Sequence, residues 1–68
     1  MNMRAWFFAQ KGKKVDLLLR RKREGERDWH EIGIVEEASD DFVAIEKGGR
    51  ANFVPYHAID RFRVHEEE

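Results

Sequence analysis

Turn-forming residues recur so closely along this sequence that it favours a run of short strands over alternating strands and helices. The pair Gly48-Gly49 is typical of a two-residue β-hairpin turn. Polar turns are also predicted over 22–28 and 37–41, and Pro55 lacks the N–H that a strand ladder needs. Apolar and polar residues alternate between these breaks, as they do in half-buried strands. Five strands are therefore predicted, over 15–21, 29–36, 42–47, 50–54 and 59–64.

A glycine and an aromatic N-terminus refine this fold class. Gly33 lies inside the second predicted strand, where a glycine often marks a bulge or a sharp bend. Met3, Trp6 and Phe7 share one helical face, although their aromatic density also suits a strand. Asn2 is a suitable N-cap, so a short helix is preferred. The prediction is a mostly β protein: a small, strongly bent barrel of five strands with a short N-terminal helix.

The size and charge of the chain set further limits. Its 68 residues predict one domain, over 1–64, followed by an acidic tail over 65–68. Without cysteine, stability must come from packed strands, from oligomerisation or from both. The net charge is −1, yet residues 1–27 carry +6 and residues 28–68 carry −7. This asymmetry suggests a surface that faces a polyanion. The alternative is that the fold mixes the two halves and cancels the charge difference. No segment has the length of a membrane span or the pattern of a signal peptide, so a cytoplasmic protein is expected.

Two short motifs, which occur in the same order along the chain, resemble motifs of the Hfq family of Sm-like (LSm) RNA-binding proteins. The D-Q-F-V motif of that family, which follows a G-x-I motif, is similar to Asp40-Asp41-Phe42-Val43, and its V-Y-K-H-A-I motif is similar to the segment 54–59. The resemblance covers 15–64. It implies a five-stranded Sm-like (SH3-like) barrel, without a cofactor, that assembles into a homo-oligomeric ring, as a hexamer, and binds single-stranded U-rich or A-rich RNA. The fourth and fifth strands would be the edges that pair between neighbouring copies.

The resemblance also implies a pore-type RNA site, formed by the turn after the second strand and the connector before the fifth. Its residues here are Asp41, Phe42, Tyr56 and His57. The aromatic rings would stack on bases, and His57 would donate to a base edge or a phosphate. The family has glutamine at Asp41 and lysine at Tyr56, and a carboxylate repels phosphate, so weaker uridine binding is expected. The structural alternatives are that Phe42 is a core residue and that His57 fastens the turn.

A second set of candidate RNA-binding residues belongs to the face of the ring opposite the pore-type site, or to the rim of the ring. Asn52 matches a polar amide on the fourth strand of Hfq-like proteins. Leu18 replaces the aromatic residue that this family uses on the same face. Cationic side chains would contact phosphates, although runs of charge are usually only solvated. The cationic members of this set are Lys11, Lys13, Lys14, Arg20, Arg21, Lys22 and Arg23.

No catalytic pattern is present in the sequence. The three histidines lack metal-ligand spacing, and Ser39 has no evident base partner, so neither an enzyme nor a metal site is expected. The alternative to RNA binding is a protein-interaction or assembly module on an SH3-like barrel, because fold does not fix function. Basic residues gathered on one face would favour RNA, and scattered ones would favour the interaction module.

Overall fold

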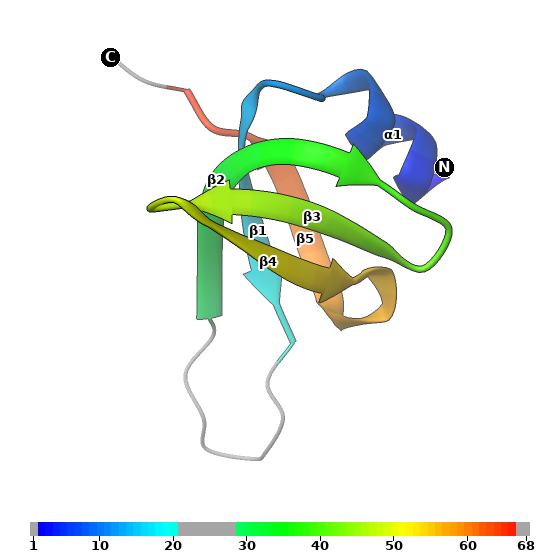
Figure 1. The fold of residues 1–68 in the computed structure, drawn as a ribbon. Coiled ribbons are helices and arrows are strands. Elements are labelled where there is room, and N and C mark those ends of the chain that lie inside the picture. The colour runs from blue at the N-terminus through cyan, green and yellow to red at the C-terminus, as the bar shows by residue number, and fades with distance from the viewer. Residues whose placement is uncertain (1, 21–28, 67–68) are drawn as a thin grey trace.

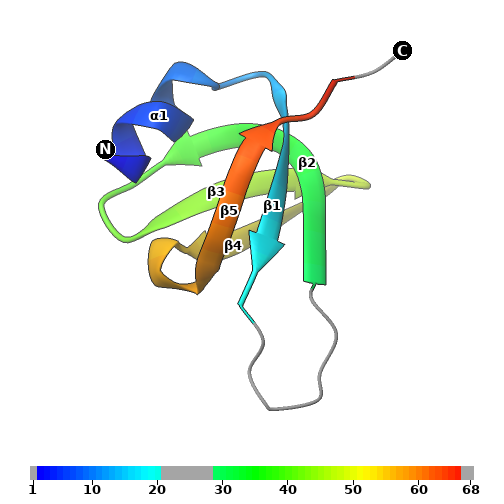
Figure 2. The same ribbon diagram turned by 180° about the vertical axis from the view of Figure 1, so that it is seen from behind.

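The computed structural model describes residues 2–20 and 29–66 of the chain. In this part, a helix, α1 (Met3–Ala9), precedes five strands, and a 3-10 turn, η1 (Tyr56–Ala58), joins the last two. The strands are β1 (Lys14–Leu19), β2 (Trp29–Ala38), β3 (Phe42–Lys47), β4 (Arg50–Pro55) and β5 (Ile59–Val64). They form one antiparallel sheet in the order β4-β3-β2-β1-β5. The sheet curls until β5 lies across from β3 and β4 (Figures 1 and 2), which confirms the predicted mostly β, strongly bent fold.

β2 is the strand that bends the sheet. Its register with β3 shifts after Val35, at a bulge, and the ladder then resumes. Because a bulge adds an unpaired residue without ending the ladder, β2 reaches Ala38, and the turn predicted from 37 was wrong at its start. A Cβ on Gly33 would overlap the side chain of Ile45 and lie 2.5 Å from the carbonyl oxygen of Glu46. The missing side chain therefore permits β3 to approach β2 at the bend.

The predicted N-terminal helix is confirmed, and it covers one end of the curled sheet (Figure 1). The Asn2 side chain caps it by accepting from the backbone N–H of Ala5 at 3.3 Å. Phe7 is fully buried, and it joins α1 to the core inside the sheet. No helix in the described residues is long and apolar enough to cross a membrane. The core consists of Phe7, Val15, Leu17, Val35, Ala38, Val43, Ile45, Val54 and Ile59.

Candidate nucleic-acid interface

The four residues of the predicted pore-type site lie together at one end of the sheet. Phe42, which is half-buried, begins β3 and pairs with Pro55 at the end of β4. The backbone N–H of Tyr56 donates to the carbonyl of Asp41 at 3.1 Å. His57 follows in η1, and its side chain is exposed. The turn before β3 and the connector before β5 are therefore side by side.

Tyr56 is engaged with the protein interior rather than open for stacking. Its ring stacks on that of Phe7, with centroids 6.0 Å apart and an interplanar angle of 17°. Its hydroxyl donates to the carbonyl of Ser39 at 2.7 Å. Burial raises the pKa of the Tyr56 phenol above its ordinary value of 10.0. One face of the ring is therefore closed to a base, and the hydroxyl is already used.

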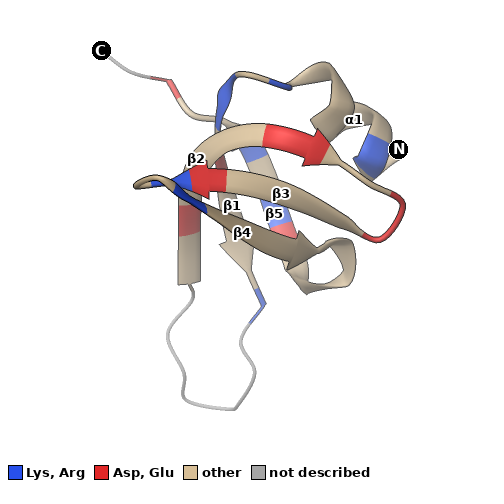
Figure 3. Ribbon diagram, in the orientation of Figure 1, with Lys and Arg blue, Asp and Glu red and all other residues tan. Residues whose placement is uncertain are grey.

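The surroundings of this pore-type site are acidic. Glu36, Glu37, Asp40 and Asp41 are all exposed, and Figure 3 shows acidic residues at the end of β2 and in the turn that follows. Arg4 of α1 pairs with Asp40 at 3.3 Å, which neutralises only part of this charge. Because carboxylates repel phosphates, the electrostatics disfavour a close RNA backbone here.

A hollow of about 790 Å³ opens on the inner side of the curled sheet, at the end where β1 finishes and β2 begins. It brings together Asn52 and Arg20, two members of the second predicted set. The indole of Trp29 also borders the hollow, and this residue is 62% exposed, so a flat ligand can reach the ring. The lining residues are Leu19, Arg20, Trp29, Glu31, Asn52, Val54 and Ala58.

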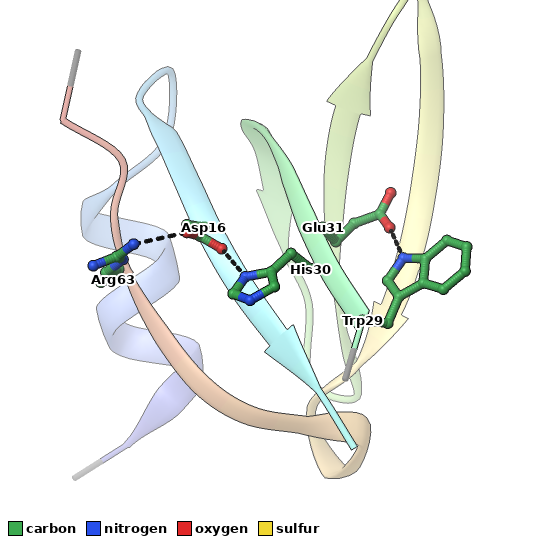
Figure 4. A network of polar contacts seen from close by, with 5 residues as sticks. All are labelled: Asp16, Trp29, His30, Glu31 and Arg63. Carbon is green, nitrogen blue, oxygen red and sulfur yellow. Dashed lines mark hydrogen bonds and ion pairs between the residues drawn. The ribbon is translucent and has the colours of Figure 1, made fainter. Parts of the chain in front are cut away.

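Glu31 fixes the polar groups of this hollow. Its side chain is only 10% exposed. One carboxylate oxygen accepts from Nε1 of Trp29 at 2.7 Å (Figure 4). The other accepts from Nδ2 of Asn52 at 2.9 Å and lies 3.6 Å from Nζ of Lys47. The indole and the amide are therefore held in place, and the amide retains an oxygen acceptor and a second N–H for a ligand.

Trp29 and Glu31 were not predicted as site residues. They stand two positions apart in β2, and this spacing alone places them on one face of a strand. Their meeting with Asn52, 21 residues further along the chain, depends on the bend of the sheet. A search for aromatic and acidic residues at strand spacing would have found the pair but not its third partner.

The lysines of the second set lie away from the hollow. Lys14 begins β1, whereas the hollow lies beyond Leu19 at the other end of the strand. The ammonium of Lys11 lies 5.4 Å from the ring centroid of Phe8, so it contacts the exposed side of α1. Lys13 and Lys14 are also exposed. Three further members of the set fall outside the described residues: Arg21, Lys22 and Arg23.

The side chains around the hollow are of kinds that can bind a ligand. Across 2–20 and 29–66, no three His, Asp or Glu side chains gather as metal ligands would. The hollow instead combines the Trp29 indole, the Asn52 amide and Arg20 with the Glu31 carboxylate, a set that can hold a planar, polar ligand.

A scan of protein-family models finds none that matches the chain, and a search of curated proteins finds no similar sequence. The resemblance to Hfq and other Sm-like proteins therefore rests on the sequence words quoted above, and its functional consequences are proposals.

Proposed function

We propose that this protein binds single-stranded RNA, with the hollow beside Trp29 as its main base-binding site. The observation that supports this proposal is the exposed indole beside a fixed amide, Asn52, and a guanidinium, Arg20. Stacking on an aromatic side chain contributes about 1–3 kcal/mol per base. The amide can pair with a base edge, and the guanidinium can neutralise a phosphate.

The pore-type residues take a secondary part in this proposal. Phe42 and His57 are accessible enough to touch a strand that crosses their end of the sheet. Asp41 and its acidic neighbours weaken phosphate binding there, and Tyr56 is engaged with Phe7. We therefore expect substitutions at Phe42 and His57 to affect RNA affinity less than substitutions in the hollow.

A homo-oligomeric ring is part of the same proposal. β4 and β5 are the two edges of the sheet, so each presents unpaired backbone groups that a second copy can pair with. Phe53 of β4 is 64% exposed and packs edge-on against Phe42, with ring centroids 5.3 Å apart, so an apolar surface lies on that edge. Light scattering should give about six times the 8.1 kDa mass of one chain. A monomer at RNA-binding concentrations would refute the ring.

Fluorescence anisotropy with labelled U-rich and A-rich oligonucleotides tests RNA binding. Trp29→Ala should weaken binding roughly 5- to 150-fold, the equivalent of one lost stacking contact. Phe8→Ala is the matched control, because it removes an aromatic residue that is 60% exposed but lies on α1, and its affinity should stay unchanged. Circular dichroism confirms that each variant is folded. Unchanged affinity in Trp29→Ala would refute the hollow, and no binding to either oligonucleotide would refute the function.

A protein-interaction or assembly module is the second candidate function. The observation that favours it is that exposed apolar side chains lie next to one another: Ile34 and Val64 line one depression, and Phe53 packs against Phe42. Contiguous apolar patches often mark protein contacts. A stable assembly that binds neither oligonucleotide at low salt would support this candidate over RNA binding.

A further inference from the structure

A second groove, of about 430 Å³, lies on the outer face of the sheet, over β1 and β5. Successive residues of a strand point to opposite faces, so His30 of β2 faces this groove while Trp29 and Glu31 face the hollow. Figure 4 shows the two groups on opposite sides of the strand. The groove is lined by Asp16, Leu18, His30, Arg61, Phe62 and Arg63.

Asp16 lies at the base of this groove, and its carboxylate is already occupied. Its side chain is 7% exposed. Oδ1 lies 3.0 Å from Nδ1 of His30, and Oδ2 accepts from a guanidinium nitrogen of Arg63 at 3.2 Å (Figure 4). Burial alone would raise the pKa of Asp16, but these two partners outweigh it and hold the pKa below its ordinary value. The carboxylate thus holds one donor on each side of β1, His30 from β2 and Arg63 from β5.

These donors remain open to solvent on their outer sides. The Arg63 side chain is 76% exposed and that of His30 is 56% exposed. Arg61 stands two residues from Arg63, and its strand partner Leu18 also pairs with His30. Within the described residues, the Arg61 side chain makes no hydrogen bond or ion pair. Three donor side chains therefore surround a groove that holds one carboxylate.

Among residues 2–20 and 29–66, no acidic side chain other than Asp16 lines the groove. Asp60, the nearest acid along β5, sits where the register of β5 against β1 shifts, and it does not line the groove. Asp16, Arg61 and Arg63 give the lining residues a net charge of +1 before any charge on His30 is counted.

We propose that this outer groove binds a phosphate group through Arg61 and Arg63, and through Nε2–H of His30 in its imidazolium form, with Asp16 as the positioning residue. Guanidinium groups match the spacing of phosphate oxygens, and donors from two strands can surround a tetrahedral anion. The phosphate can be a diester in an RNA strand, which rests on the function proposed above, or a free phosphate ion. Both sources share one chemistry, and the experiments below separate them.

NMR titration of the ¹⁵N-labelled protein with inorganic phosphate, at constant ionic strength, tests the groove directly. Saturable shifts should be confined to the signals of Arg61, Arg63 and His30. Arg61→Gln should weaken phosphate binding roughly tenfold, and it leaves the contacts of Asp16 intact. Arg50→Gln, which removes an exposed arginine of β4, is the matched control and should change nothing. Shifts that do not saturate, or that Arg50 shares equally, would overturn the proposal.

Asp16→Asn separates positioning from simple charge. If only net charge mattered, removal of an anion would strengthen phosphate binding. If Asp16 positions Arg63 and His30, the variant should bind phosphate more weakly while its circular dichroism spectrum is unchanged. Equal or stronger binding would remove Asp16 from the proposed site.

The salt dependence of oligonucleotide binding identifies the source of the phosphate. If an RNA diester occupies the groove, Arg61→Gln should lower the slope of log affinity against log salt by about 0.7. An unchanged slope together with saturable phosphate binding would assign the groove to free phosphate. The phosphate titration needs no RNA, so the groove can fail while RNA binding stands, and RNA binding can fail while the groove stands.

Discussion

Gly33 is the position where the bent sheet has no room for a side chain, and Gly33→Ala tests this directly. The new Cβ would overlap the side chain of Ile45, which is fully buried, and would lie 2.5 Å from the carbonyl oxygen of Glu46. Overpacking of this kind costs about 1–3 kcal/mol, and the upper end applies because a backbone carbonyl cannot rotate away. The loss of glycine flexibility in the unfolded chain returns about 0.4–1 kcal/mol.

The net loss in the free energy of unfolding should therefore be about 2–3 kcal/mol, or roughly 10–20 °C in Tm for a domain of this size. Urea and thermal unfolding followed by circular dichroism measure it. Gly48→Asn is the control, because a side chain at Gly48 meets open space and asparagine tolerates its φ of +58°. The control should stay within about 0.5 kcal/mol of the wild type. If the free energy of unfolding of Gly33→Ala also stayed that close to the wild type, the close approach of β3 would not be what fixes the bend.

Two further predictions concern buried polar groups. Asp16→Asn should lower stability near neutral pH by about 1–3 kcal/mol, because the contacts of His30 and Arg63 with a charged carboxylate are lost. Since the folded-state pKa of Asp16 lies below its ordinary 3.8, this deficit should shrink as the pH falls below 3.8, and a constant deficit in urea unfolding would contradict the assignment. Tyr56→Phe should cost about 1 kcal/mol, because the carbonyl of Ser39 loses its donor. Because the folded-state pKa of Tyr56 is raised, the contribution of Tyr56 to stability should be lost as the pH rises above 10.0. Ultraviolet titration of this single tyrosine should show a midpoint above that value. Ionisation at 10.0 would count against its burial.

Alternation and turn residues predicted the five strands, although β1 ends at Leu19, before the predicted end of the first strand at 21. In the predicted first strand, Val15 and Leu17 alternate with the charged Asp16, and both apolar residues are fully buried in β1. Gly48-Gly49 joins β3 to β4 as the predicted hairpin, with Lys47 opposite Arg50 and positive φ at both glycines. These features depend on neighbours in sequence, which is why they can be read from it.

The polar clusters could not be predicted in the same way. Asp16 sits between two core residues on the side of β1 where a charged residue is expected to be solvated. It is buried because His30, 14 residues away, and Arg63, 47 residues away, cover it from the two neighbouring strands. The strand pairing that brings them together depends on the order of strands in the sheet, and no local pattern encodes that order.

The register of β2 connects the hollow beside Trp29 to the outer groove over β1 and β5. His30 lies between Trp29 and Glu31, so a slip of one residue would exchange the faces of all three. Gly33 opposes such a slip, because the slip would place Ile32 or Ile34 against β3 at the point where only glycine fits. The same glycine that permits the bend thus fixes which side chains reach each surface.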